Sequence, residues 1–521
     1  MPTLNWIGKD KVVNHHLDVP YRVLEEQYTF GDNADGNMII HGDNLDALKA
    51  LLPRFEGRVK CIYIDPPYNT GNEGWVYNDN VNDPKIRKWL GEVVGREGED
   101  LSRHDKWLCM MYPRLKLLQK LLAEDGVIFI NIDDTECAYL RLICDEIFGY
   151  GNFLASIAWE KRYTRSNNAN LFYSLKDTIL CYRKSTKLTA IKEARTEKAD
   201  SNYSNPDNDP RGEWMTASYV NPATKDKRPN LVYAIESPDG RIINHPTHAW
   251  KYKYEEHLKH VAENRLWWGN NGDAQYPRLK LYKNEMPGMV PVDVWSYKET
   301  GTTDDGGNTI KDIFGSLVFD TPKPTSLIER IIKMIPEKDA IILDSFAGSG
   351  TTAHAVLNMN KQDGGHRRFI LVETEDYAEN ITAERVRRVI NGYGEGKKAV
   401  EGTGGGFSFY ELGAPLMIDG NLNPDVPEAR IREYVYYTET KLPMPPASEA
   451  EPHLLGVHNR AAYYFYYLPD TVTTLNEAFL RTIRTEVDSF MIYADINALD
   501  EATMKRHHIT FKKIPRDITL L

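Results

Sequence analysis

The chain has few of the features that direct a protein to a membrane. None of the apolar runs in its 521 residues approaches the length of about 20 residues that a membrane span needs. Residues 1–10 lack the basic flank and apolar segment of a secretory signal. Hydrophobic residues make up 41% and charged residues 27% of the chain, as in ordinary globular proteins. We therefore expect a cytoplasmic protein without a membrane partner.

Cysteine is scarce and unpaired. The chain holds five cysteines, all within its first 181 residues and none in a CxxC pair: Cys61, Cys109, Cys137, Cys144 and Cys181. An odd number without paired spacing argues against both disulfides and zinc. The neighbouring histidines at 15–16 and 507–508 have no further ligand types nearby. The sequence thus predicts buried, inert thiols and no metal.

Positive charge is also in short supply. The 64 lysines and arginines are outnumbered by 75 acidic residues, for a net charge of −11. Phosphate contacts usually leave a basic signature, so a DNA-binding surface would have to be local. A weakly periodic region at 185–312 does mix tryptophans with cations such as Lys225, Lys227 and Arg228. This composition suits either base stacking with phosphate contact or the core of an ordinary small domain.

What the chain has instead is a repeated alternation of strands and helices. Short apolar strands are predicted at 37–42, 59–64, 127–132, 340–343 and 368–372. Helical patterns lie between them, including one that begins near Tyr112 with Pro113 in its first turn. This order predicts an α/β fold with a parallel sheet covered on both faces.

The most informative motif, Asp65-Pro66-Pro67-Tyr68, stands where the strand 59–64 ends. A carboxylate beside prolyl carbonyls forms a stiff edge that accepts hydrogen bonds without donating any. Such an edge is suited to a neutral amino group and not to phosphate. A simple solvated turn explains a single Asp-Pro but poorly explains an acid, two prolines and an aromatic together.

A second motif, DSFAGSGTT at 344–352, joins a strand to a helix. Gly348 and Gly350 let a ligand approach the backbone closely, and the helix N-terminus offers free amides. A phosphate-binding P-loop would need a lysine before the Ser/Thr, whereas here Gly350 precedes Thr351. Glu373, at the end of the next strand, is placed to accept hydrogen bonds from ribose hydroxyls. The turn therefore predicts a site for a cofactor that contains a nucleoside.

Together these residues resemble the DNA amino-methyltransferases. The catalytic motif precedes the cofactor motif, as in the circularly permuted beta class of these enzymes. More specifically, HGDNL at 41–45, YIDPPYN at 63–69, NIDD at 131–134 and DSFAGSGTTAHAV at 344–356 resemble the modification subunit of type III restriction systems. The similarity spans about residues 37–412.

The resemblance implies transfer of a methyl group from S-adenosylmethionine to the N6 amino group of adenine in a specific sequence of double-stranded DNA. Asp65 and the Pro66 carbonyl would accept the two amino hydrogens, Pro67 would stiffen the loop, and Tyr68 would stack on a flipped-out base. The cofactor would lie against a larger set of residues: Asp344, Phe346, Gly348, Gly350, Thr351, Thr352 and Glu373, with Lys323 lining the same pocket and Asp43 reaching the adenine edge. Capping of the helix that follows is an equal alternative for Asp43.

The resemblance also implies a domain plan: an N-terminal segment (1–36), the catalytic half of a Rossmann-like core (37–184), an inserted target-recognition domain (185–312), the cofactor half (313–412) and a small α+β assembly domain (413–521). A homodimer and a restriction subunit with translocase activity are the implied partners. Lys176 departs from the pattern, because relatives often place His or Asn near it, close to the flipped base.

Two other functions remain open at this point. N4-cytosine methylation uses the same geometry, but relatives that make this product more often carry Ser at the position of Asp65. A catalytically silent DNA-specificity subunit belongs to a different class, and it would not need to bind S-adenosylmethionine.

Overall fold

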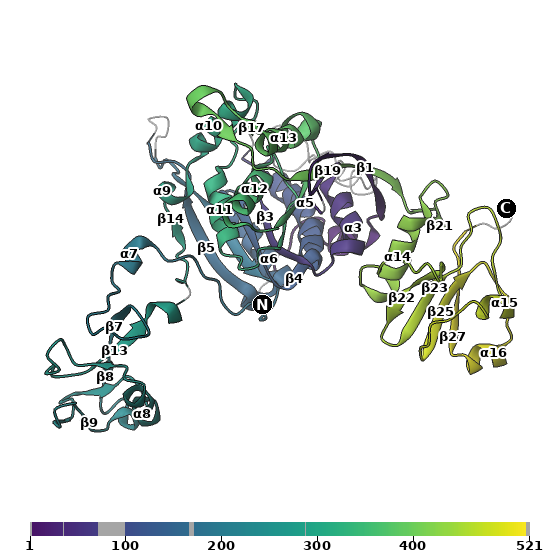
Figure 1. Cartoon of the computed structure of the whole chain (residues 1–521). Coiled ribbons are helices and arrows are strands. Elements are labelled where there is room, and N and C mark those ends of the chain that lie inside the picture. The colour runs from purple at the N-terminus through teal and green to yellow at the C-terminus, as the bar shows by residue number, and fades with distance from the viewer. Residues whose placement is uncertain (1–2, 35, 71–98, 166–170, 287, 517–521) are drawn as a thin grey trace. The chain divides into compact units, whose positions relative to one another are not determined.

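The computed structural model describes residues 3–34, 36–70, 99–165, 171–286 and 288–516. It divides the chain into two compact units, one formed by residues 1–189 and 292–521 and the other by residues 190–291 (Figure 1). Each unit has a core of its own. No described helix combines the length and the apolar character that a membrane crossing requires.

The first unit is built on a ten-stranded mixed sheet with the strand order β1-β19-β2-β16-β15-β3-β4-β6-β5-β14. The six strands from β19 to β4 run parallel to one another, whereas β1 and β6 are antiparallel to their neighbours. Their bounds are β1 Arg22–Gly31, β2 Met38–His41, β3 Val59–Ile64, β4 Leu122–Ile132, β5 Phe153–Glu160, β6 Lys176–Arg183, β14 Val294–Trp295, β15 Ile341–Asp344, β16 Arg368–Glu373 and β19 Gly406–Pro415. The predicted α/β fold is confirmed.

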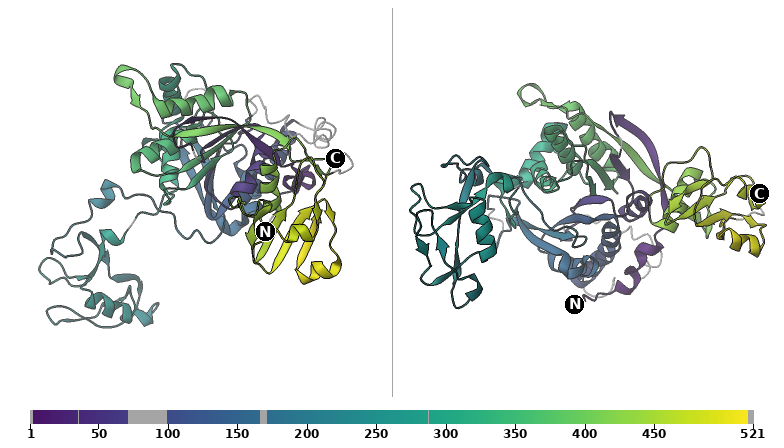
Figure 2. Two further views of the ribbon diagram at one scale, coloured as in Figure 1. Left: turned by 45° about the vertical axis from the view of Figure 1, so that its right-hand side comes forward. Right: turned by 60° about the horizontal axis from the view of Figure 1, so that its bottom comes forward.

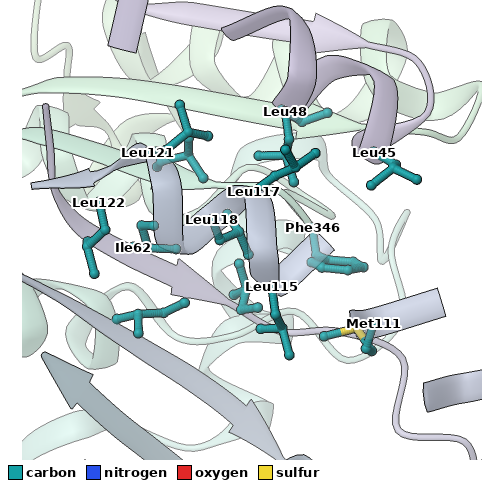
Figure 3. Close-up of a cluster of buried hydrophobic side chains, with 14 of the residues drawn as sticks. Leu45, Leu48, Ile62, Met111, Leu115, Leu117, Leu118, Leu121, Leu122 and Phe346 are labelled. Carbon is teal, nitrogen blue, oxygen red and sulfur yellow. The ribbon is translucent and has the colours of Figure 1, made fainter. Parts of the chain in front are cut away.

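Helices cover both faces of this sheet (Figures 1 and 2). On one face lie α3 Asn44–Phe55, α5 Glu99–Leu121 and α6 Cys137–Cys144, and on the other lie α11 Thr325–Lys333, α12 Thr351–Asp363 and α13 Glu384–Asn391. Alternate residues of β3 face the two layers. Ile62 and Ile64 belong to one buried cluster with α3 and α5, whereas Cys61 and Tyr63 do not. Figure 3 shows Ile62 among the side chains of this cluster, which also include Leu115 and Leu118 of α5. Burial on both faces explains why the central strands are apolar throughout.

Helix α5 begins well before the predicted start near Tyr112, which is therefore wrong. It starts at Glu99, so Pro113 lies inside the helix and not in its first turn. A proline there removes one backbone hydrogen bond. The preceding turns from Trp107 to Met111 are fully buried, however, and this apolar contact continues the helix on both sides of Pro113.

The N-terminal segment adds an edge strand to the main sheet, whereas the C-terminal residues form a sheet of their own. Residues 1–36 contribute the short helices α1 Lys9–Val12 and α2 His15–Asp18 and the edge strand β1, which pairs with β19. β19 itself runs across the boundary expected at 412/413. Beyond it, the elements are β20 Met417–Ile418, β21 Asn421–Leu422, α14 Glu428–Thr440, β22 Leu454–His458, β23 Ala461–Phe465, β24 Thr474–Leu475, α15 Glu477–Leu480, β25 Ser489–Ala494, β26 Ile496–Asn497, α16 Glu501–Arg506 and β27 Ile509–Lys513. β22, β23, β25 and β27 form a separate four-stranded sheet.

The second unit is smaller than the insertion expected at 185–312. Residues 292–312 belong to the first unit, where β14 extends the main sheet and is followed by α9 Tyr297–Thr300 and α10 Thr303–Phe314. The second unit holds α7 Glu197–Asp200, β7 Trp214–Ser218, β8 Val220–Thr224, β9 Ile235–Glu236, β10 Ile242–Ile243, β11 His248–Trp250, α8 Tyr254–Ala262, β12 Leu266–Trp267 and β13 Arg278–Tyr282. Trp250 and Trp268 are buried in its core, which favours the structural explanation for these rings.

Candidate active site

Two strands that lie far apart in the sequence are neighbours at the centre of the sheet. β3 and β15 pair in parallel, with Ile342 opposite Cys61 and Leu343 opposite Ile62. Their carboxyl ends therefore open on the same edge, where a pocket of about 580 Å³ is found. The lining residues come from both predicted motifs and from two further segments: Tyr63, Asp65, Pro66, Pro67, Tyr68, residues 319–323, Asp344, residues 346–349, Thr351, Thr352, Glu373, Glu375 and Tyr377.

The Asp65 carboxylate stands at the end of β3 with donors on both of its oxygens. Oδ1 accepts a hydrogen bond from the Tyr68 hydroxyl at 2.9 Å and another from Asn131 Nδ2 at 3.0 Å. Oδ2 forms an ion pair with the Lys323 ammonium. The side chain of Asp65 is 25% exposed and lines the pocket.

Tyr68 is held by the same group of side chains. Its hydroxyl contacts Asn131 Nδ2 and donates to Asp177 Oδ2 at 3.2 Å, as an alternative to its bond with Asp65. Asp177 in turn pairs with Lys161 at 2.6 Å. Burial and the nearby carboxylate of Asp65 raise the pKa of the Tyr68 phenol well above its usual range, and burial likewise raises the pKa of Asp177. The phenol therefore stays protonated and serves as a hydrogen-bond donor.

Side chains of α5 hold the loop after Asp65 in place. Trp107 Nε1 donates to the Pro67 carbonyl at 2.7 Å. Asn69 adopts a left-handed conformation with φ 58° and donates to the buried Glu136, which also contacts His104 Nδ1 at 2.6 Å. None of the hydrogen bonds among the described residues ends on the Pro66 carbonyl. Because Pro67 is engaged, Pro66 is the prolyl carbonyl left to meet a ligand.

At the end of β15, the Asp344 carboxylate is satisfied by its own turn. Oδ1 accepts from the Phe346 amide at 3.1 Å, and Oδ2 accepts from the Thr352 hydroxyl at 2.6 Å. The residue is 3% exposed. Burial raises the pKa of Asp344 to about 7.

The two glycines of this turn have backbone conformations that favour glycine. Gly348 has φ 52°, and a Cβ there would lie 3.2 Å from the Phe319 ring. Gly350 has φ 81° and stands at the N-cap of α12, where a Cβ would lie 3.1 Å from the Thr382 carbonyl oxygen. Gly350 is not itself among the residues that line the pocket. The turn is thus tightly packed on its outer side and open toward the pocket at Gly348.

Glu373 ties the end of β16 to the glycine turn. Its Oε2 accepts from the Gly348 amide at 2.7 Å, and its Oε1 accepts from the amides of Thr374 at 2.9 Å and Glu375 at 3.0 Å. Burial raises the pKa of Glu373 to about 7, although these amide hydrogen bonds act in the opposite direction. A carboxylate has about four acceptor positions, so it can still accept from a ligand hydroxyl.

The structure also gives the contacts of Asp43, Lys323 and Lys176, and for Asp43 it favours the capping alternative. Asp43 caps α3 by accepting from the Leu45 amide at 2.8 Å, it pairs with the buried Arg114, and it does not line the pocket. Lys323 lines the pocket, but its ammonium contacts the Asp65 carboxylate. Lys176 forms an exposed pair with Asp134 at 2.8 Å, while its neighbour Asp177 points to Tyr68.

Sequence reasoning missed several residues of this site. Asn131 and Asp177 contact the Tyr68 hydroxyl, and they carry a signal that could have found them, because they lie near the ends of β4 and β6, the two strands that follow β3 in the sheet order. Phe319 and Tyr377 form an edge-to-face ring pair at 5.5 Å in the pocket wall and lie on segments without periodicity. Among the residues that the structure describes, no group of three or more His, Cys, Asp or Glu side chains could hold a metal ion.

The largely parallel sheet brings an acidic loop with two prolines opposite a glycine turn. This arrangement defines a class of protein in which a ligand that contains a nucleoside lies beside hydrogen-bond acceptors for an amino group. Sequence comparisons give this class a family. The profile of the DNA methylase family matches residues 59–384, and the chain belongs to this family.

The individual relatives include type III modification subunits and a type II methyltransferase. The Mod subunit of the type III restriction-modification enzyme StyLTI from Salmonella typhimurium is 35% identical over 397 residues, which cover 73% of this chain and 59% of the relative. The Mod subunit of EcoPI from Escherichia phage P1 is 31% identical over 72% of this chain and 64% of its own length. The type II methyltransferase M.KpnI from Klebsiella pneumoniae is 31% identical over 66% of this chain and 81% of its own length. The resemblance to type III modification subunits is confirmed, although the chain spans less than two thirds of the two Mod subunits.

Proposed function

We propose that the chain is a DNA methyltransferase that transfers a methyl group from S-adenosylmethionine to the N6 amino group of adenine. One observation supports this above all others. The ends of β3 and β15 open into one pocket, so that the amino-accepting edge at Asp65 faces the glycine turn at Gly348. A methyl transfer needs both halves within one enclosed space.

The pocket suits the cofactor. Asp344 and Glu373 are buried carboxylates beside an open glycine turn, and the hydroxyl of Tyr63 is buried in the same pocket without a partner among the described residues. Phe346, Gly348, Thr351 and Thr352 complete the wall that would hold the ligand, with Gly350 supporting the turn from behind. When bound, S-adenosylmethionine supplies a methyl group on a positively charged sulfur.

The residues of the chain would then prepare the amino group of the base. The lone pair of an exocyclic amine is delocalised into the ring, so the amine must be held in a pyramidal form to react. Asp65 Oδ2 and the Pro66 carbonyl would accept its two hydrogens and stabilise the positive charge that grows on nitrogen. Tyr68, fixed through its hydroxyl, would stack on the base after its rotation out of the duplex.

The second unit is the candidate for reading the DNA sequence. Within it, Lys227, Arg228, Lys251 and Lys253 are exposed, on the loops that follow β8 and β11. By contrast, the buried Lys280 pairs with Asp207 and Asp209 and is not available to phosphate. These exposed cations are the candidates for phosphate contact on this unit.

The test is methylation of DNA by the purified protein with labelled S-adenosylmethionine. Nucleoside analysis of the product should show N6-methyladenine, and sequencing of the methylated positions should show one recognition sequence. If N4-methylcytosine is the sole product, the target base is cytosine and not adenine, because Asp65 and Pro66 could hold either amino group. Failure to bind S-adenosylmethionine would instead support a silent DNA-specificity subunit.

The relatives support a narrower assignment within the same proposal. Two of those described above are type III Mod subunits, and we propose the same role for this chain. It would be a cytoplasmic homodimer that methylates double-stranded DNA and associates with a restriction subunit. Residues 413–521 would serve the assembly. Light scattering of the purified protein should give the mass of a dimer, and a monomer at micromolar concentration would contradict this part of the proposal.

A further inference from the structure

The Lys323 ammonium occupies the position where the amino group of a target base is expected. Oδ1 of Asp65 already accepts from Tyr68 and Asn131, so Oδ2 is the oxygen that remains for a ligand. Lys323 sits on this oxygen and is 11% exposed. A neutral amine competes poorly with an ammonium for a carboxylate, because the charged partner makes the stronger hydrogen bond. As it stands, the acceptor edge is closed to a base.

The backbone of Lys323 belongs to the other side of the pocket. Its carbonyl accepts from the Thr351 hydroxyl at 3.2 Å, and Thr351 is the first residue of α12, directly after the glycine turn. Only the side chain extends toward the catalytic loop, where its Nζ also lies 5.4 Å from the centre of the Tyr68 ring. Rotation of this flexible side chain would therefore return the ammonium to the cofactor side without moving the fold.

The charges in the pocket give a reason for such a rotation. Its described lining residues include the acids Asp65, Asp320, Asp344, Glu373 and Glu375, and Lys323 is the one lysine or arginine among them. Four amides of the turn are not available to an anion, because those of Phe346, Ala347, Gly348 and Gly350 already donate within the protein. A ligand carboxylate in this pocket thus finds its counter-charge at Lys323.

We propose that Lys323 exchanges partners, moving its ammonium from Asp65 to the amino-acid carboxylate of the bound cofactor and so opening Oδ2 to the base. The exchange rests on the proposed function, and it adds a coupling between binding of the cofactor and binding of the base. Cofactor occupancy favours acceptance of the base, and by thermodynamic reciprocity the base favours the cofactor. In the absence of cofactor, the same ion pair keeps the catalytic carboxylate covered.

The coupling can be measured without DNA and without turnover, by calorimetric titration with S-adenosylhomocysteine, which keeps the amino-acid carboxylate. In wild type, binding must break the Asp65 pair. Asp65→Asn removes that cost, so the variant should bind about tenfold more tightly, within the usual range of coupling between sites. Lys323→Met should bind more weakly than wild type. In the double variant, Asp65→Asn should have no further effect, because the exchanging partner is gone.

Two controls isolate the exchange. Methylthioadenosine lacks the amino-acid carboxylate, so its affinity should be the same for wild type and Asp65→Asn. Asp376→Asn removes an exposed carboxylate next to the pocket residues Glu375 and Tyr377 but is not itself part of the lining, and it should leave S-adenosylhomocysteine binding unchanged. Circular dichroism of each variant confirms that it is folded.

The outcomes separate the exchange from the function on which it rests. If the wild-type protein binds S-adenosylhomocysteine but Asp65→Asn binds it equally well, the exchange is overturned and the methyltransferase proposal stands. An equal gain for methylthioadenosine would also overturn the exchange, since it would show a general effect of charge. A wild-type protein that binds neither ligand would overturn both proposals.

Discussion

The two strand ends that form the pocket are built in different ways. At the end of β15, Asp344 is buried and takes its hydrogen bonds from residues two and eight positions later. At the end of β3, Asp65 is partly exposed, and two of its three partners, Asn131 and Lys323, come from distant segments. The cofactor end is thus a local structure, whereas the catalytic end is assembled from several elements. A local turn keeps its shape when its surroundings change, and an assembled site depends on each of its contributors.

The largest effect should follow from Asp65→Asn. An amide at this position presents a donor where the substrate amine needs an acceptor, so the rate of methyl transfer should fall by roughly 10²- to 10³-fold, as for loss of one electrostatic contact to a transition state. Transfer of labelled methyl groups to DNA measures it. Cofactor binding by the same variant should not weaken, because the β15 end is built separately and the variant loses the ion pair that holds Lys323 on Asp65. Activity within tenfold of wild type would remove Asp65 from its assigned role.

Asn131→Leu tests whether the catalytic end depends on its distant contributors. Leucine fills a similar volume but cannot donate to Asp65 or Tyr68, so the carboxylate loses one of the bonds that orient it. We expect kcat to fall by roughly 10- to 100-fold, as for other residues that orient a reacting group, with little change in cofactor affinity. An equal loss of cofactor binding would show that the two ends are not independent.

Gly348→Ala tests how closely the cofactor end is packed. The new Cβ would meet the Phe319 ring at 3.2 Å, and affinity for S-adenosylmethionine should fall by about tenfold as the pocket wall shifts. Gly364→Ala is the matched control. Gly364 has a similar φ of 67°, but a Cβ there would have nothing within 4 Å. Gly364→Ala therefore carries the backbone cost of roughly 1–2 kcal/mol without a new steric contact. Equal affinities for the two variants would contradict the close packing.

Cofactor affinity should also depend on pH. Burial raises the pKa of Asp344 and of Glu373 to about 7, so in the ligand-free protein both carboxyls hold protons below that pH. A ligand that donates hydrogen bonds favours the ionised forms, which means that binding releases protons and tightens as pH rises from 6 to 8. Calorimetry in buffers of different ionisation enthalpy measures the release. Glu373→Gln should bind more weakly at pH 8 and show a shallower slope, and an unchanged slope would exclude Glu373.

The smallest functional effect is expected from Asp43→Asn. Asparagine caps a helix as well as aspartate does, so α3 should remain intact. The buried Arg114 loses its charged partner, which should lower the free energy of unfolding, measured by denaturant titration. Affinity for S-adenosylmethionine should change by less than about twofold, within the usual error of such tests of a distant residue. A large loss of affinity would restore the predicted contact of Asp43 with the adenine of the cofactor.

Local patterns in the sequence predicted the five consecutive parallel strands at the centre of the sheet, from β2 to β4. The strands β2, β3, β15 and β16 were expected within one or two residues, because each is an apolar run bounded by polar residues and turns. The beginning of α5 was not, because the burial of Trp107 to Met111 overrides the usual meaning of Pro113 as a residue of the first turn. Nor could composition show that β14 returns to the main sheet after the second unit, since pairing with β5 is a long-range event.

The sequence by itself determined the chemical types at the two strand ends: an acid with two prolines and an aromatic ring at one, and a glycine turn between two acids at the other. These are fixed by neighbours along the chain, and a motif is by nature local. Only the tertiary structure decided what surrounds them. It placed β3 beside β15, directed Asn131 and Lys323 to the two oxygens of Asp65, and paired Asp43 with Arg114. These contacts join residues whose separation along the chain carries no signal, because packing of the sheet and not sequence distance brings them together.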